Sequence, residues 1–157
     1  MSDAQLDEDG VIVACASCGQ KNRLAYERLS DPVRCGSCRQ ELAAPGVPID
    51  VHSSADFDRL VGRASLPLVV DYWAPWCGPC RMVAPELQKV AARRAGHLLV
   101  VKVNTDALND LAERFGIRSI PMLAVFSGGR EVARTVGARP ASDIEAFIEE
   151  ATRSPHH

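Results

Sequence analysis

The sequence contains no hydrophobic run that approaches the roughly 18 residues needed to cross a bilayer. Its amino terminus, MSDAQLDEDG, is acidic and polar and has neither the basic nor the apolar segment of a signal peptide. The net charge is only −2, which gives no basic surface for nucleic acid or for an anionic membrane. We therefore expect a cytoplasmic protein that binds neither membranes nor nucleic acid.

The four histidines do not form a recognisable catalytic or metal-binding motif. His52 and His97 stand alone at predicted strand boundaries, without the spacing of a ligand set. His156 and His157 end the chain after a Ser-Pro pair, and we do not count them as a metal site. No internal repeat or low-complexity tract is visible apart from paired CxxC motifs.

What the chain does have is an ordinary globular composition and six cysteines. Of its 157 residues, 46% are hydrophobic and 24% are charged. Cysteines in a chain without an export signal indicate metal or redox chemistry rather than structural disulfides. They form two groups, four within the first forty residues and two at the start of a predicted helix.

The first group has the spacing C-x₂-C-x₁₆-C-x₂-C, which is typical of a zinc ribbon, and consists of Cys15, Cys18, Cys35 and Cys38. Each CxxC is a short knuckle that turns two sulfurs toward one point. Gly19 can supply the positive φ that such a turn favours, and Gly36 lies inside the second knuckle. We expect residues 1–42 to form a zinc-ribbon-like module that binds one Zn²⁺ ion.

Three roles remain open for these four thiols. We favour a structural zinc ion, because the segment from Gln5 to Leu42 has too few large apolar residues for a core of its own. The alternatives are a second redox dithiol or a zinc site that releases its metal on oxidation. A catalytic zinc is disfavoured, since four cysteinates leave no position for water.

A linker over residues 43–48, rich in proline and lacking periodicity, separates this module from residues 49–157. The second region alternates between strand and helix patterns. Strands are predicted over 49–52, 68–73, 98–103, 122–126 and 131–136, the last two joined by a Ser-Gly-Gly-Arg hairpin. Helices are predicted after Ser53, from Cys77, over 108–115 and near the carboxyl terminus, where Pro140 and Ser142 compete as the start.

The second cysteine group lies where a buried strand meets a helix. Cys77-Gly78-Pro79-Cys80 follows the apolar strand LVVDYW and opens a helical pattern. Unpaired N–H groups and the helix dipole stabilise a thiolate there, which lowers the pKa of an exposed cysteine. The i, i+3 spacing also lets the two sulfurs close a small disulfide ring.

The segment VDYWAPWCGPCRMVAP resembles the thioredoxin family almost position for position, and with the amino-terminal cysteines the chain resembles the thioredoxin 2 type. The resemblance implies a thioredoxin fold, an α/β mixed sheet with helices on both faces. It also implies a protein-disulfide reductase that acts on disulfide-containing client proteins. Thioredoxin reductase would be its electron donor, with no bound organic cofactor. We expect a monomer.

Two charged residues gain roles from the resemblance. Asp71 lies within an apolar strand, where desolvation should raise the pKa of its carboxyl and make it a proton acceptor near neutral pH. The family's matching aspartate assists proton transfer at the second cysteine, here Cys80. Lys102 matches the lysine that accompanies that carboxylate, with a solvated strand lysine as the alternative interpretation.

The resemblance also implies a substrate-binding surface. Ile120 and Pro121 match a cis-proline pair whose backbone binds extended substrate, and Trp76 and Gly137 would belong to the apolar rim. Met122 stands where many thioredoxins have threonine, a departure that changes the groove rather than the chemistry.

Two other functions stay open. One is a redox-regulated, zinc-dependent binding module or chaperone, in which oxidation of the four amino-terminal cysteines ejects zinc and exposes a binding face. The other is a disulfide-forming oxidase or isomerase, which the Gly-Pro pair between Cys77 and Cys80 and the missing signal peptide disfavour.

Overall fold

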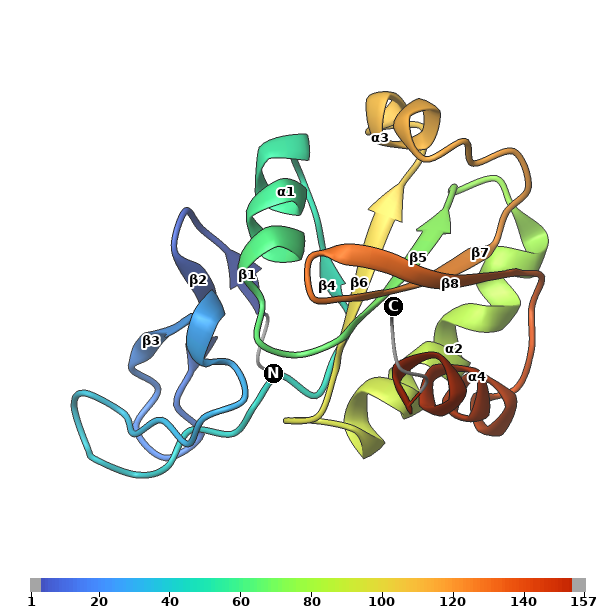
Figure 1. Ribbon diagram of the computed structural model, residues 1–157. Helices are drawn as coiled ribbons and strands as arrows, with labels where there is room; N and C mark the ends of the chain where they lie inside the picture. The colour runs from blue at the N-terminus through green and yellow to red at the C-terminus, as the bar shows by residue number, and fades with distance from the viewer. Residues whose placement is uncertain (1–3, 154–157) are drawn as a thin grey trace.

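The computed structural model describes residues 4–153, so His156 and His157 lie outside the described residues. The chain forms a small three-stranded sheet followed by a five-stranded sheet with helices on both faces. Figure 1 shows the small sheet at one side of the molecule, next to helix α1 (Ser54–Arg63). No helix within residues 4–153 is long and apolar enough to cross a membrane.

The amino-terminal module, described over residues 4–42, is an antiparallel sheet in the order β1-β2-β3 followed by a 3₁₀ turn. The strands are β1 (Gln5–Leu6), β2 (Gly10–Ala14) and β3 (Lys21–Ala25), and the turn is Tyr26–Arg28. From the sequence a short strand is expected over residues 21–26; β3 follows this expectation up to Ala25, and Tyr26 begins the turn instead. The sequence did not reveal β1 and β2.

The larger sheet has the order β4-β6-β5-β7-β8. Strands β4, β6 and β5 are parallel, whereas β7 and β8 are antiparallel to their neighbours, so the sheet is mixed as predicted. The predicted strands are confirmed with small shifts at their ends: β4 (Ile49–Asp50), β5 (Leu68–Trp73), β6 (Leu99–Asn104), β7 (Met122–Ser127) and β8 (Arg130–Val136).

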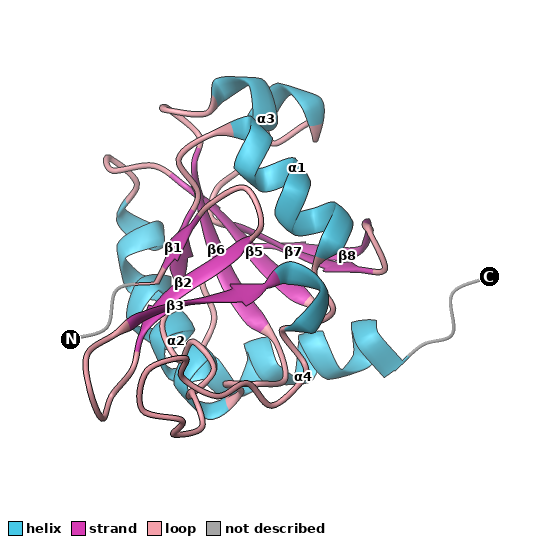
Figure 2. Cartoon of the chain, turned by 90° about the vertical axis from the view of Figure 1, so that its left-hand side faces the viewer, coloured by secondary structure: helices cyan, strands magenta, loops and turns pink. Residues whose placement is uncertain are grey.

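Four helices cover the two faces of this sheet. Figure 2 shows α1 and α3 (Asn109–Arg114) on one side, and α2 (Gly78–Arg93) and α4 (Ala141–Arg153) on the other. Each side of the sheet has its own hydrophobic core. Burial on both faces explains why β5 and β7 read as continuous apolar runs.

Helix starts illustrate what the local sequence can and cannot specify. Ser53 is the N-cap of α1, as predicted, because its hydroxyl accepts a hydrogen bond of 3.1 Å from the Asp56 N–H. For α4, neither Pro140 as first residue nor a Ser142 cap is right, since the helix begins at Ala141. The Ala141 N–H donates to the carboxylate of Glu86 in α2 at 3.0 Å, so the cap comes from another element.

The amino-terminal module shares its hydrophobic core with α1. Val11 and Tyr26 belong to the same buried cluster as Phe57 and Leu60. At the end of α1, the Arg63 guanidinium contacts the Glu27 carboxylate at 2.6 Å, the Glu8 carbonyl at 2.9 Å and the face of the Tyr26 ring. The apolar residues that the module lacks are therefore supplied by its neighbour in the chain.

Candidate active site and cysteine cluster

The two cysteines of the CGPC motif form a disulfide at the amino terminus of α2. Cys77 is the N-cap residue of the helix, and the Cys80 N–H donates to its sulfur at 3.2 Å. The two Cα atoms are 5.3 Å apart, within the usual range for a disulfide. The predicted strand-to-helix junction is thus confirmed, and it places the sulfur of Cys77 at the positive end of the helix dipole.

The other wall of the site is the loop before β7. The Ile120–Pro121 peptide bond is cis, as the resemblance implied, and the Ile120 carbonyl oxygen lies 3.8 Å from the Cys77 sulfur. The Gly137 N–H donates to the Pro121 carbonyl at 2.9 Å, with φ of +103° at Gly137, a conformation that favours glycine. Ile120, Pro121 and Gly137 therefore lie together. They come from two segments of the chain, the loop before β7 and the end of β8, that meet beside the disulfide.

Cys77 is less accessible than expected for an attacking cysteine. Its residue is only 4% exposed, and it packs with Ala74 and Cys80 in a small apolar cluster bordered by Trp73 and Ile120. Packing of the turn before α2 against the Ile120 loop causes this burial.

Asp71 is a buried carboxylate on the face of the sheet that α2 covers. It is 1% exposed, and neither of its oxygens has a hydrogen-bond partner among the described residues. Desolvation raises the pKa of Asp71 to about 7, against an opposing effect of the nearby Lys102 ammonium. The sequence-based expectation of a proton acceptor near neutral pH has this physical basis.

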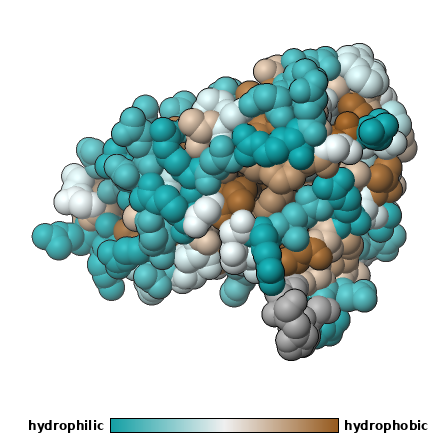
Figure 3. All heavy atoms as spheres, turned by 45° about the horizontal axis from the view of Figure 1, so that its top comes forward, coloured by the Kyte–Doolittle hydropathy of each residue, from teal (hydrophilic) through white to brown (hydrophobic). Residues whose placement is uncertain are grey.

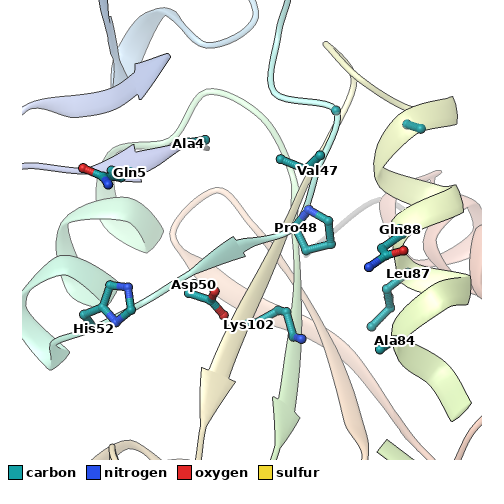
Figure 4. A pocket seen from close by; sticks show the side chains of 12 residues that line it. Ala4, Gln5, Val47, Pro48, Asp50, His52, Ala84, Leu87, Gln88 and Lys102 are labelled. Atoms are coloured by element: carbon teal, nitrogen blue, oxygen red, sulfur yellow. The ribbon is translucent and has the colours of Figure 1, made fainter. Parts of the chain in front are cut away.

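Lys102 stands in register with Asp71 on the neighbouring strand β6. Its ammonium nitrogen lies 4.6 Å from the centroid of the Trp73 ring, a cation–π contact. Lys102 also lines an open pocket of about 740 Å³ together with Asp50, His52 and Gln88. Figure 4 shows the Asp50 and Lys102 side chains on adjacent strands within this pocket, which gives solvent a path to the lysine.

Trp76 projects from the turn before Cys77 and is 69% exposed. Its indole N–H donates to the Asp106 carboxylate, with the nearer oxygen at 3.0 Å. Sequence reasoning missed Asp106, since it lies thirty residues away in a loop after β6. Arg81, directly after Cys80, donates to the Pro75 carbonyl at 2.8 Å and holds the same turn.

Exposed hydrophobic side chains occur around this end of the molecule. Trp76, Met82 and Val136 each expose about half or more of their surface. In Figure 3 the amino-terminal side of the molecule is mostly hydrophilic, whereas hydrophobic surface gathers over the side that holds the five-stranded sheet. Ile117, by contrast, is half-buried and packs against the core.

The four amino-terminal cysteines converge on one point. All four sulfurs lie within 4.8 Å of one another, and the Cys15–Cys38 and Cys18–Cys35 sulfur pairs are each 3.6 Å apart. A tetrahedral zinc site with Zn–S bonds of about 2.3 Å requires sulfurs about 3.8 Å apart. The four residues therefore fit a Zn²⁺ ion.

The two knuckles have the same backbone geometry. The N–H groups of Gly19 and Arg39 donate to the carbonyls of Cys15 and Cys35 at 2.8 and 3.0 Å. Gly19 has φ of +80°, as predicted. In the second knuckle the positive φ falls at Arg39, with φ of +68°, and not at Gly36. Arg39 occupies the position equivalent to Gly19, directly after the second cysteine of the knuckle.

Hydrogen bonds to sulfur favour the thiolate at two of the four cysteines, Cys15 and Cys35, whereas burial and the neighbouring cysteine sulfurs raise the pKa of Cys38 to about 11. The backbone N–H of Cys38 and then the side chain of Asn22 lower the pKa of Cys35 to about 6. The backbone N–H groups of Cys18 and Ser17 lower the pKa of Cys15. Zinc binds cysteine as the thiolate, so the two lowered pKa values suit metal ligands.

A CxxC pair that forms a disulfide at the start of a helix, next to a cis proline on a mixed sheet, defines a dithiol–disulfide oxidoreductase of the thioredoxin fold. The family models agree: residues 48–150 match the thioredoxin model, and residues 14–40 match the model described as "Thioredoxin 2, N-terminal". The chain belongs to the thioredoxin family, and its amino-terminal segment is of the thioredoxin 2 kind.

Known relatives support this assignment over nearly the whole chain. Thioredoxin C-3 of Corynebacterium nephridii is 36% identical over 140 residues, covering 89% of this chain and 94% of the relative. Thioredoxin 1 of a Nostoc species is 45% identical over 97 residues, covering 62% of this chain and 91% of the relative. The solved thioredoxin of Malassezia sympodialis superposes with a TM-score of 0.61 at 32% identity, covering 68% of this chain and 93% of its own.

Proposed function

We propose that the protein is a protein-disulfide reductase in which Cys77 attacks the substrate and Cys80 resolves the mixed disulfide. The observation that carries this proposal is the Cys77–Cys80 disulfide at the amino terminus of α2, beside the Ile120 carbonyl. The Gly-Pro pair between the cysteines supports reduction over oxidation, by resemblance to the reducing members of the family.

The reaction is two successive thiol–disulfide exchanges. The Cys77 thiolate attacks one sulfur of the substrate disulfide, the Cys77–substrate bond forms, and the other substrate sulfur leaves as a thiolate that takes a proton from solvent. Cys80 then loses its proton and attacks the Cys77 sulfur, which releases the second substrate thiol. The substrate gains two electrons, and the Cys77–Cys80 pair becomes the disulfide that the structure contains.

Asp71 and Lys102 act in the second exchange. We assign Asp71 as the acceptor of the Cys80 proton, because it is buried beneath α2 with a pKa near neutrality. The positive charge of Lys102 limits the rise in the Asp71 pKa that desolvation causes, and so keeps the ionised form accessible at neutral pH. Its place in an open pocket supports a solvent route for the proton.

Substrate would bind as an extended segment along the loop before β7. The Ile120 backbone, Pro121 and Gly137 form one rim of the site, and the exposed Trp76 forms the other. Main-chain hydrogen bonds to such an edge recognise backbone rather than sequence. A reductase with many different protein clients needs this kind of recognition.

The amino-terminal cysteines would hold one structural Zn²⁺ ion, ligated by Cys15, Cys18, Cys35 and Cys38. When bound, the ion cross-links the two knuckles, which supports a module with little core of its own. We place this module within residues 1–42, a linker at 43–48 and the thioredoxin domain at 49–157. Four unpaired thiols suit a reducing, cytoplasmic compartment with thioredoxin reductase as electron donor.

The test is reduction of insulin by NADPH and thioredoxin reductase. It compares wild type, Cys77→Ser, and the quadruple serine variant of the amino-terminal cysteines, with zinc content measured in each. We expect no activity for Cys77→Ser, and retained activity with lost zinc for the quadruple variant. Inactivity of the wild type would overturn the reductase assignment. A single Cys18→Ser variant, at the exposed ligand, separates loss of zinc from loss of folding.

A redox-regulated binding module remains the second candidate, and one observation favours it. Cys18 is exposed, and its sulfur lies 3.6 Å from that of the buried Cys35, so an oxidant can reach a pair poised for a disulfide. Zinc release at mild peroxide together with new client binding would support it. Full retention of zinc by the protein with oxidised Cys77–Cys80 would exclude it.

A further inference from the structure

One amide side chain outside both cysteine motifs bridges the two knuckles. Asn22 lies in β3, between the knuckles in sequence, and is half-buried. Its Nδ2 group donates to the Cys35 sulfur at 3.4 Å and to the Gln20 carbonyl at 3.0 Å. Its Oδ1 atom accepts from the Gly36 N–H at 3.0 Å.

These contacts link the first knuckle to the second. The Gln20 carbonyl that Asn22 contacts also accepts the hydrogen bond of 2.8 Å from the Cys15 N–H, which closes the first knuckle. The Gly36 N–H and the Cys35 sulfur both belong to the second knuckle. A primary amide has two N–H donors and one carbonyl acceptor, and Asn22 uses all three within the cluster.

The contact to Cys35 is directed at a buried ligand. Cys35 has no exposed surface, so solvent cannot donate to its sulfur. N–H groups of the protein do so instead: the Asn22 amide and the Ser37 backbone N–H, each at 3.4 Å, and the backbone N–H of Cys38. Four thiolates around one Zn²⁺ ion leave a net charge of −2, which N–H donors stabilise by hydrogen bonding to sulfur.

We propose that Asn22 is a positioning residue of the cysteine cluster, which fixes the Cys35 thiolate by an N–H···S hydrogen bond and holds the two knuckles in register. This inference rests on the proposal that the cluster binds Zn²⁺. The side chain acts through Cys35 and does not itself ligate the ion.

Three variants of the zinc-loaded, full-length protein test this role. Asn22→Ala removes all three contacts. Asn22→Asp keeps an acceptor for the Gly36 N–H but loses the donor and puts a negative charge against the sulfur. Gln20→Ala is the matched control, two residues away, because the Gln20 side chain is exposed and donates only to the Lys21 carbonyl.

The first readout is the rate at which a chelator with a colour change removes zinc. We expect zinc release about tenfold faster for Asn22→Ala. Release should be faster still for Asn22→Asp, and unchanged for Gln20→Ala. Insulin reduction should be the same in all three, since none lies near Cys77. Wild-type release rates for both Asn22 variants would overturn the proposal.

The second readout is spectroscopic and does not respond to a loss of stability alone. With Co²⁺ in place of Zn²⁺, the sulfur-to-cobalt charge-transfer band should move to longer wavelength in both Asn22 variants, because a thiolate without its N–H donor is easier to oxidise. An unshifted band in Asn22→Asp would overturn the N–H···S role, even if Asn22→Ala folds poorly. A wild-type protein that binds neither metal would instead refute the zinc proposal itself.

Discussion

Lys102 of β6 stands directly opposite Asp71 of β5, and its ammonium lies over the Trp73 ring rather than against the carboxylate. The cation is therefore close enough to influence Asp71 but leaves both carboxylate oxygens without a protein partner among the described residues. An unpartnered carboxylate with a pKa of about 7 can exchange a proton at physiological pH. A full ion pair would instead keep Asp71 ionised at all such pH values.

Replacing Asp71 with Asn should slow resolution of the mixed disulfide at least about tenfold at pH 7.5, because Cys80 loses its proton acceptor. In the wild type, the rate should rise with pH through a midpoint near 7, where Asp71 ionises. In Asp71→Asn that midpoint should be absent. Stopped-flow insulin reduction between pH 5.5 and 9 measures both, and an unaltered profile would contradict the assignment.

The same substitution should stabilise the fold at alkaline pH. The native pKa of about 7 lies above the usual aspartate value of 3.8, so the native state binds more protons than the unfolded state between these values. Stability from this group is complete below pH 3.8 and is lost as pH rises through 7. A difference of about three pKa units corresponds to about 4 kcal/mol as an upper limit.

Because a buried Asn amide without partners carries its own cost, we expect Asp71→Asn to raise the free energy of unfolding by about 1–3 kcal/mol at pH 8.5. The gain should be much smaller at pH 4. Urea denaturation at the two pH values gives the comparison. Destabilisation that is equal at both would show that Asp71 titrates normally.

Removing the positive charge of Lys102 should move the midpoint of the pH–rate profile to higher pH. In Lys102→Gln the desolvation of Asp71 is no longer opposed, so its pKa, and the midpoint of the rate profile, should rise by up to about one unit. Lys89→Gln, on the exposed side of α2, is the control for a lost positive charge. A common midpoint in both variants would show that Lys102 has no special influence.

Asp106 should hold Trp76 in place for substrate binding. Asp106→Ala frees the indole N–H, and the loss of one exposed hydrogen bond should lower kcat/KM for insulin about two- to fivefold, mainly through KM. The Trp76 ring should become more mobile, which the decay of its fluorescence anisotropy measures. Asp31→Ala, far along the chain in the amino-terminal module, controls for the charge change; an equal effect there would argue against a local role.

Tyr26 should couple the amino-terminal module to the larger domain. It is fully buried, its hydroxyl donates to the Asp7 carbonyl at 2.6 Å, and its carbonyl accepts from the Ser65 N–H at 3.0 Å. Tyr26→Phe should cost about 1 kcal/mol, and Tyr26→Ala about 3–5 kcal/mol, in one unfolding transition. Two separate transitions, with the larger domain unaffected, would show that the two parts fold independently.

The features that the residues predicted without the help of the family resemblance are those set by near neighbours in the chain. Cys77 and Cys80 lie on one turn of helix, and the two zinc-ribbon knuckles are four-residue turns. A carboxylate within the apolar strand LVVDYW is unusual enough to be noticed from the sequence. Alternating strand and helix patterns were enough for the mixed sheet, because amphipathic periodicity and caps are local properties.

The remaining features depend on segments that only folding brings together. The register of β5 and β6 decides that Lys102 faces Asp71, a pairing that only the family resemblance had implied, and the loop after β6 brings Asp106 to Trp76. Glu86 caps a helix more than fifty residues further along the chain, and Asn22 reaches the second knuckle from β3. The local pattern of residue types specifies backbone preferences and hydrophobic faces. A hydrogen bond between side chains that are distant in sequence exists only once packing has fixed both partners.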